Sequence, residues 1–407
     1  MTLDPRVADR LSARLAADDA ARQDRYPGVA AQRQPVHTVY VPADQLTAGI
    51  VGVWGAAALA ALDAHGPLPC ADGGRDDEVD ALVRDKLATE PIEDLRIDFE
   101  DGYGSPSSAV EDVDARAAAR ALARDVADGV APRFTGIRMK SLDRPSRRRG
   151  IRTLDLFLDT LLAAGSLPAG FRVTLPKVTS VDQVEAMVEL CFALDAEYGL
   201  PALRFELQVE TPQAILGADG TVLVARMIHA AAGRCAGLHY GTYDYSGSIE
   251  IAAAYQSMEH PAADYAKAVM QVAAAGTGVP VCDGSTNVLP VGDAEQVRAA
   301  WALHARLVRR SLERGFYQGW DLHPAQLPTR FAATFGFYRS GLSDAAGRLL
   351  AYRERRCLGV LDEPATAKAL ARFLLRAVEC GAAELGEVSA QAGVTPTELT
   401  DFAAART

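Results

Sequence analysis

Residues 203–241 read LRFELQVETPQAILGADGTVLVARMIHAAAGRCAGLHYG. Two β-rich runs, 203–209 and 235–241, flank an Ala-rich amphipathic segment at 212–232. A strand, a helix and a second strand in this order predict a βαβ unit, in which the two strands run parallel.

The same alternation continues in both directions from this unit. Six further strands are expected, at residues 37–42, 94–99, 134–139, 172–177, 279–284 and 316–323. The other amphipathic segments lie between them, at 45–65, 108–128, 152–164, 181–199, 259–275 and 294–314. Eight such units favour a closed (β/α)8 TIM barrel over an open doubly wound sheet. The first strand is followed by ADQLTAG (43–49), and not by the GxGxxG of a dinucleotide-binding fold.

We therefore expect three parts in the chain. They are an N-terminal helical segment (1–35), a TIM-barrel catalytic domain (36–324) and a C-terminal helical extension (325–407) that caps the barrel or makes an oligomer contact. Within the extension, helices are expected at 325–340, 344–358, 364–385 and 396–404. The polar, Gly- and Asp-rich segment 66–92 is expected to form a loop insertion before the second strand.

Composition excludes several classes of partner. The 407 residues carry 42 Lys+Arg against 53 Asp+Glu, a net charge of −11, whereas binders of nucleic acid or of anionic membrane surfaces need basic patches. No apolar run reaches the roughly 18–20 residues of a membrane span, and the N-terminus has no secretory signal. The six cysteines are scattered, as reduced core thiols are, so we expect a cytoplasmic protein. From the charge we expect neither a nucleic-acid nor a membrane partner, while a small-molecule carboxylate substrate stays possible because a few arginines suffice to bind it.

Acidic residues stand at the ends of two neighbouring strands. Glu210 ends the fifth strand just before Pro212, and Asp244 follows the sixth. Adjacent strands lie about 4.8 Å apart, so the two carboxylates can share one hard cation. Open positions for water and substrate oxygens suit Mg²⁺ better than Zn²⁺.

Other charged or polar residues fall at strand ends of the same rim. They are Asp98, Glu100 and Asp101 after the second strand, Arg138 and Lys140 after the third, Lys177 after the fourth, and His323 with Pro324 after the eighth. The cations are what an anionic substrate needs. Each residue also has a structural interpretation: the acids can cap the helix near Ser108 or pair with Arg138 and Lys140. Their convergence at the carboxyl ends of the strands favours an active site.

In motif order from about residue 36 to 375, the chain resembles the citrate lyase β-subunit-like branch of the HpcH/HpaI aldolase superfamily, whose relatives include malate synthases. The stretches that carry the resemblance are VHTVYVPAD (36–44), IDFED (97–101), GIR (136–138), LPKV (175–178), VET (209–211), GTYDY (241–245), LHPAQ (322–326) and GVLDEPA (359–365). The chain departs from the family at Gly319-Trp320, where the family has Gly-Lys. RPSRRR (144–149) has no counterpart; it is read as a solvated basic loop, with an anion clamp as the alternative.

The resemblance implies a carbon–carbon bond lyase or aldolase that uses Mg²⁺, or Mn²⁺, on a 2-oxo or 2-hydroxy carboxylate or on its coenzyme A thioester. It implies Glu210 and Asp244 as metal ligands and Asp362 as the acid/base. Arg138 would bind the substrate carboxylate, with Glu100 and Asp101 holding metal-bound waters or Arg138 itself. Lys177, His323 and Pro324 belong to motifs expected to bind the substrate or its thioester carrier. A homo-oligomer is expected, a trimer or a hexamer.

Four functions stay open at this point. The first two are a lyase or malate-synthase-like condensing enzyme on a coenzyme A thioester, and an aldolase that splits a 2-oxo acid without coenzyme A. The third is a phosphoenolpyruvate or pyruvate phosphotransferase on a similar barrel, although no GxxxxGK[ST] is present. The fourth is a non-catalytic scaffold, against which the intact Arg138, Glu210, Asp244 and Asp362 argue.

Overall fold

The computed structural model describes residues 4, 6–28, 33–69, 77–356 and 362–404. Eight parallel strands form one sheet in the order β7-β6-β5-β4-β3-β2-β1-β8. Their bounds are β1 His37–Pro42, β2 Asp94–Asp98, β3 Phe134–Arg138, β4 Phe171–Leu175, β5 Arg204–Val209, β6 Cys235–Tyr240, β7 Val281–Cys282 and β8 Gly319–Asp321. The amide of Asp283 donates to the carbonyl of Gln318 at 2.8 Å and that of Trp320 to Gly284 at 3.1 Å. These bonds join the two ends of the sheet, and the expected TIM barrel is confirmed.

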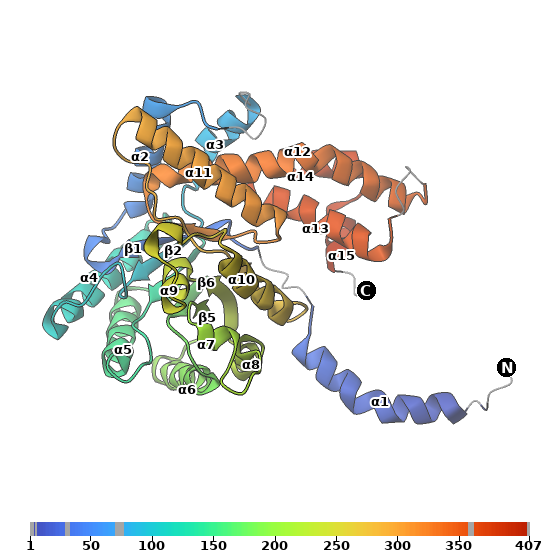
Figure 1. Ribbon diagram of the computed structural model, residues 1–407, viewed down its shortest axis with the longest axis horizontal. Helices are drawn as coiled ribbons and strands as arrows, with labels where there is room; N and C mark the ends of the chain where they lie inside the picture. Colours follow the sequence, from blue (N-terminus) through green and yellow to red (C-terminus); the bar gives the residue numbers. More distant parts are fainter. Residues whose placement is uncertain (1–3, 5, 29–32, 70–76, 357–361, 405–407) are drawn as a thin grey trace.

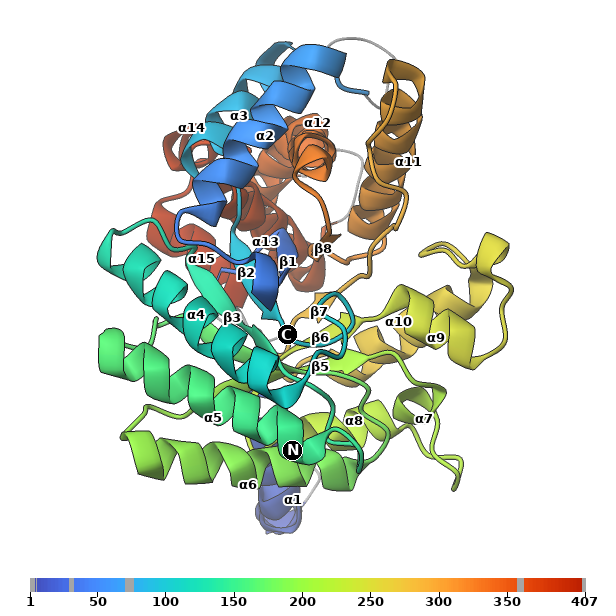
Figure 2. The same ribbon diagram turned by 90° about the vertical axis from the view of Figure 1, so that its left-hand side faces the viewer.

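Helices surround the strands on the outside of the barrel (Figures 1 and 2). They are α2 Ile50–His65, α3 Asp77–Thr89, α4 Ser108–Ala127, α5 Arg147–Ala164, α6 Val181–Tyr198, α7 Pro212–Ile215, α8 Leu223–Ala230, α9 Thr242–Ser248, α10 Pro261–Ala274 and α11 Ala294–Glu313. Local sequence explains several starts, because Ser107 and Ser180 cap α4 and α6 and Asp293 forms a capping box with Gln296 on α11.

The inside of the barrel contains a charged layer below the strand ends. Arg96 is fully buried and forms ion pairs with Asp94 and Glu206, each at 2.8 Å. Burial alone would raise the pKa of Glu206, but Arg96 and His239 hold it well below its usual value. The layer links β2 to β5 across the barrel and so fixes the strands whose ends carry the candidate site.

Four helices follow the barrel: α12 Leu327–Arg353, α13 Pro364–Cys380, α14 Leu385–Ala392 and α15 Pro396–Ala404. On α13, the electrostatic environment of Glu379 includes Arg33, which precedes β1, and Arg133, which precedes β3. The second half of α13 therefore covers the amino ends of the strands, opposite to the rim where Glu210 and Asp244 follow their strands.

Three sequence-based boundaries are wrong. Residues 66–92 are not only a loop, because α3 forms there and buries Val79, Val83 and Leu87. The segment 212–232 forms two helices, α7 and α8. The expected break between two helices near residue 342 is absent, and Gly341 lies inside α12. The Phe373 ring packs against this glycine so closely that a Cβ atom there would come within 2.9 Å of the ring.

Three further observations concern the described helices and cysteines. None of the described helices is long and apolar enough to cross a membrane. Cys191, Cys235, Cys282 and Cys380 are buried free thiols, while Cys70 and Cys357 lie outside the described residues. The N-terminal helix α1 (Arg6–Arg25) buries none of its side chains.

Candidate active site

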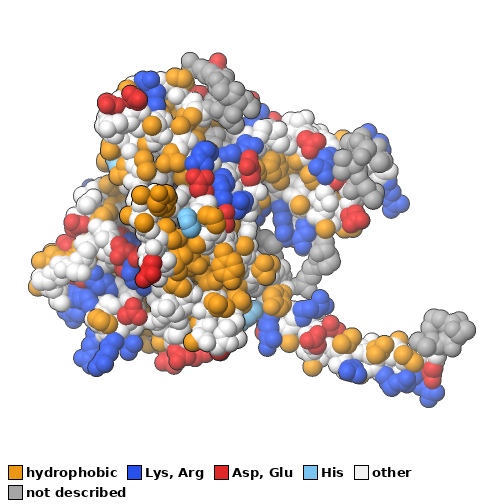
Figure 3. Space-filling model, in the orientation of Figure 1, with side chains coloured by type: hydrophobic (Ala, Val, Ile, Leu, Met, Phe, Trp, Pro, Cys, Tyr) orange, Lys and Arg blue, Asp and Glu red, His pale blue; other side chains and the backbone are white. Residues whose placement is uncertain are grey.

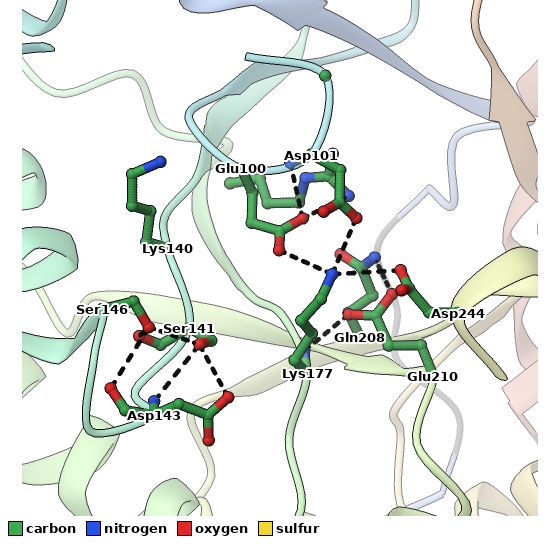
Figure 4. A network of polar contacts seen from close by, with 12 residues as sticks. Glu100, Asp101, Lys140, Ser141, Asp143, Ser146, Lys177, Gln208, Glu210 and Asp244 are labelled. Atoms are coloured by element: carbon green, nitrogen blue, oxygen red, sulfur yellow. Dashed lines mark hydrogen bonds and ion pairs between the residues drawn. The ribbon is translucent and has the colours of Figure 1, made fainter. Parts of the chain in front are cut away.

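The carboxyl ends of five strands bring the expected residues together at one rim. Arg138 ends β3, while Lys177 and Glu210 follow β4 and β5 within two residues of the strand end. Glu100 and Asp101 follow β2, and Asp244 lies in the first turn of α9, after β6. Figure 4 shows the side chains of Glu100, Asp101, Glu210 and Asp244 gathered around Lys177.

Lys177 places its ammonium among three carboxylates. Its Nζ lies 2.8 Å from Oε1 of Glu100, 2.9 Å from Oδ2 of Asp101 and 3.2 Å from Oδ2 of Asp244. Its backbone has φ +52°, a left-handed conformation that is costly for a residue with a side chain. Burial opposes the charged form, yet Glu210 and Glu100 raise the pKa of Lys177, so the lysine is a fixed cation.

Glu210 is the most deeply buried acid of the group. Its Oε1 accepts the backbone N–H of Lys177 at 2.7 Å, and its Oε2 accepts from Nε2 of Gln208 at 2.5 Å. Burial, supported by the negative charges of Asp244 and Glu100, raises the pKa of Glu210 to about 8. Glycine is required at 241, because a Cβ atom there would lie 2.5 Å from Oε2 of Glu210.

Arg138 is held by Asp98, one of the acids at the end of β2 for which pairing with Arg138 was the structural interpretation. Its Nε and Nη2 donate to the two oxygens of Asp98, both at 2.6 Å, while its Nη1 lies 3.6 Å from Oε2 of Glu100. The guanidinium also lies 4.8 Å from the centre of the Tyr40 ring. Asp98 thus orients Arg138 and leaves its Nη1 side facing Glu100.

Glu100 and Asp101 both pair with the lysine and also contact each other. The amide of Asp101 donates to Oε2 of Glu100 at 2.8 Å. Burial raises the pKa of Glu100. Burial acts in the same direction on Asp101, but hydrogen bonds from Glu100 and Lys177 lower its pKa to about 2. At neutral pH, Asp101 is therefore the ionised partner of Lys177.

The donor set fits a hard divalent cation. Within the described ranges no group of three or more His, Cys, Asp and Glu side chains is arranged to hold a metal ion. Mg²⁺, however, binds through one or two carboxylates and keeps several waters, and Glu210 with Asp244 supplies two. The ammonium of Lys177 beside Asp244 shows that the surrounding carboxylates favour positive charge at this place.

Other expected residues lie apart from this group. Asp362 pairs with Arg348 of α12 at 2.6 Å, and the C-terminal end of α12 lies far from the barrel strands in Figure 1. His323 and Pro324 follow β8 at the same rim, but Nδ1 of His323 accepts the amide of Ala325, and burial lowers the pKa of this histidine. In the described residues, neither has an ion pair or hydrogen bond with the Lys177 group.

The basic stretch 144–149 is structural. Arg147 opens α5 and donates to the carbonyl of Leu142, and Arg149 pairs with Glu111 at 3.1 Å and with Asp112 at 2.7 Å. Arg147 and Arg149 thus have partners in the same chain, and the second half of the stretch is the start of α5 and not the solvated loop expected from the sequence.

Sequence reasoning missed several buried polar atoms inside the barrel. The atoms without a hydrogen-bond partner include Oη of Tyr40, Oε1 of Gln208, Nδ1 of His239 and Nε1 of Trp320. The Tyr40 and Trp320 rings lie 4.7 Å apart, and the His239 ring lies 6.3 Å from that of Trp320. An unsatisfied buried donor or acceptor costs about 1–3 kcal/mol, so a bound molecule or water would stabilise this part of the barrel. One of these residues has a sequence signal: the alternation of side chains along a strand places Gln208 on the same face as Glu206 and Glu210.

Comparisons with known proteins agree with the fold. A family model described as "Domain of unknown function (DUF6986)" matches residues 15–407. A citrate lyase from Burkholderia xenovorans LB400 has 20% identity and a TM-score of 0.58, over 89% of this chain and 97% of the other. A malate synthase from Haloferax volcanii, solved with magnesium and glyoxylate, has 14% identity and a TM-score of 0.50, over 93% and 99%. A search of curated proteins found no match. At these identities the solved structures show a common fold, and the expected resemblance is confirmed at that level.

Proposed function

The chain belongs to the family described as "Domain of unknown function (DUF6986)", and on this premise we propose that it is a Mg²⁺-dependent carbon–carbon bond lyase or aldolase acting on a 2-oxo or 2-hydroxy carboxylate. The observation that carries the proposal is the meeting of two acids at Lys177, with Arg138 fixed beside them: Glu210 accepts the backbone N–H of Lys177, and Asp244 pairs with its ammonium. Two enzymes that share the barrel fold, a citrate lyase and a malate synthase, agree with this class.

Glu210 and Asp244 would hold the metal. When bound, Mg²⁺ would supply Lewis-acid polarisation of the substrate oxygen next to the carboxylate. Lys177 would keep its contacts with Glu100 and Asp101, so that the site retains one cation of its own. The raised pKa of Glu210 shows how strongly this carboxylate requires a positive partner in order to ionise.

Arg138 would bind the substrate carboxylate through Nη1, since Asp98 already occupies Nε and Nη2. The unpartnered atoms of Tyr40, Gln208 and Trp320 lie on the inside of the barrel, where they would complete the polar contacts of a bound acid. In the cleavage direction a base takes the proton of the hydroxyl group on one of the two bonded carbons, and the carbon–carbon bond breaks as that carbon becomes a carbonyl. The electron pair of the bond passes to the other carbon as an enolate, which an acid protonates.

Asp362 is our candidate for this acid/base, and the structure limits how it can act. The carboxylate pairs with Arg348 and lies outside the Lys177 group of its own chain. In this arrangement it would serve the barrel of a second copy, which makes a homo-oligomer part of the proposal.

An exposed apolar face agrees with assembly. Figure 3 shows hydrophobic side chains gathered over α10 on the face turned to the viewer. Tyr265 and Val272 of this helix are 57% and 80% exposed, and nearby in sequence Tyr255 is 72% exposed. Exposed apolar patches of this kind are typical of protein interfaces.

Proton exchange in D₂O tests the function and separates its two forms. The protein with Mg²⁺ is incubated with pyruvate, and separately with acetyl-CoA plus glyoxylate, and the methyl protons are followed by NMR. Metal-dependent exchange into pyruvate identifies the 2-oxo acid aldolase, whereas exchange or consumption of acetyl-CoA identifies the thioester lyase or condensing enzyme. EDTA and Asp244→Ala are the controls. Absence of both signals would refute the proposal in both forms and favour phosphoryl transfer or a scaffold.

A further inference from the structure

A cavity of about 570 Å³ lies at the amino end of the barrel. Its walls come from the starts of β4 and β5, from residues before β7 and β8, and from α13 and α15 of the C-terminal helices (Figure 1). It is separate from the rim of Glu210 and Asp244, because the two lie at opposite ends of the strands.

Arginine dominates the charge of this cavity. Among the described residues, the lining includes Arg33, Arg172, Arg204, Arg372 and Arg376, with Glu379 as the one acidic residue. Arg33 is already neutralised by Glu90 and Glu93, at 2.9 and 2.5 Å. Arg172 lies 3.4 Å from the buried Glu206.

The other three arginines have no ion pair within the described part of the chain. Arg204 donates from Nη2 to the carbonyl of Cys235 at 3.1 Å, and its buried Nε has no partner. Arg372 donates from Nε to the carbonyl of Ala403 at 3.0 Å. Arg376 stacks on the Tyr317 ring at 3.9 Å. These contacts fix the guanidinium groups and leave most of their donors free.

The positive charges act on one another. Burial lowers the pKa of Arg204 and Arg372, and Arg172 and Arg376 respectively lower them further. Glu379, whose pKa is raised by burial against the effect of Arg376, cannot balance three guanidinium groups. Half-buried like charges destabilise a fold unless an anion joins them.

We propose that this cavity binds a small organic anion with at least two negative charges, carried by phosphate or carboxylate groups. Guanidinium groups bind both kinds of oxyanion through paired N–H donors. The volume suits a small molecule, and the apolar walls formed by Ala274, Val279 and Leu375 would cover its carbon part. The site is independent of the proposed reaction, so its test does not depend on activity.

Calorimetric titration in EDTA, with NaCl at matched ionic strength, tests the proposal. The probes are inorganic pyrophosphate and citrate, which separate the phosphate from the carboxylate chemistry. At least one should bind the wild type, and Arg372→Gln/Arg376→Gln should weaken that binding tenfold or more. Arg120→Gln removes an exposed arginine of α4 outside the cavity and should leave the affinity within about twofold.

Two further variants keep the result interpretable. Gln271→Glu adds a negative charge to the lining without removing an arginine, and should weaken binding about fivefold or more. This variant tests the proposal independently if the double variant does not fold. Asp244→Asn changes the catalytic rim and should leave the affinity unchanged. Failure of both probes to bind the wild type, or equal affinity in wild type and Gln271→Glu, would overturn the proposal. So would a loss of binding confined to Asp244→Asn.

Discussion

The ammonium of Lys177 lies 3.2 Å from the carboxylate of Asp244, so a side chain of this chain already neutralises one of the two acids proposed to hold Mg²⁺. The same ammonium also contacts Glu100 and Asp101. The lysine and the metal ion would therefore compete for Asp244, while Lys177 keeps its two other partners.

Lys177→Gln should raise the affinity for Mg²⁺ by about three- to tenfold, because it removes a competing cation from the group. Titration calorimetry with MgCl₂ measures this directly. Lys140→Gln is the matched control, since Lys140 follows the adjacent strand β3 by two residues but donates to the carbonyls of Phe99 and Gly104. Weaker Mg²⁺ binding in Lys177→Gln than in the control would show that the lysine supports the metal site instead of competing with it.

Glu210→Gln should change how stability depends on pH. The folded pKa of about 8 lies above the ordinary value of 4.5, so folding binds this proton more tightly. Protonated Glu210 therefore adds to the free energy of unfolding. This contribution is fully present below about pH 4.5 and is lost as the pH rises to 8, at a rate of at most roughly 1.4 kcal/mol per pH unit.

In EDTA, Glu210→Gln should therefore gain stability relative to wild type between pH 5.5 and pH 8.5, measured by urea unfolding. Glu189→Gln, at an exposed position on α6, should show no such trend. A difference between Glu210→Gln and wild type that stays constant with pH would mean that Glu210 is ionised throughout.

The pair of Asp98 and Arg138 should couple strongly in a double-mutant cycle. Both side chains are buried, at 1% and 6% exposure, so Arg138→Met alone leaves an unpaired buried carboxylate and should cost about 3–5 kcal/mol. The double variant Asp98→Asn/Arg138→Met should recover at least about 1 kcal/mol of that loss. Additive effects in urea unfolding would show that the two groups are independently solvated.

Part of this structure follows from the sequence and part depends on tertiary packing. β1 occupies the expected residues 37–42, and the acids after β5 and β6 meet because parallel strands end at one rim. The unbroken helix α12 depends on Phe373 packing against Gly341, which no local propensity reports. The left-handed backbone that directs Lys177 into the acids is also a tertiary result.

The arginine cavity shows the same limit more clearly. Arg204 and Arg372 come from parts of the sequence far apart and belong to no motif, and only the return of α13 below the barrel brings them together. Asp362, in contrast, stands in a recognisable motif, but its separation from Glu210 could be seen only in three dimensions.

Mixing two inactive variants tests the proposed role of Asp362. Asp244→Ala should abolish metal-dependent turnover and leave the fold intact, because the Asp244 side chain is 41% exposed and, among the described residues, forms an ion pair with Lys177 alone. Asp362→Asn should bind Mg²⁺ and substrate normally but lower turnover by orders of magnitude, as expected for loss of an acid/base.

If Asp362 serves the barrel of another copy, equal amounts of the two variants, unfolded and refolded together, should regain about a quarter of wild-type activity. In such a mixture, about a quarter of the sites combine an intact rim with an intact Asp362 from a neighbour. Mixing without subunit exchange is the control and should restore nothing. Near-normal turnover of Asp362→Asn alone would remove its catalytic role. Inactivity of the refolded mixture, with oligomers shown to form, would mean that Asp362 reaches its own barrel after a rearrangement of α12 and α13.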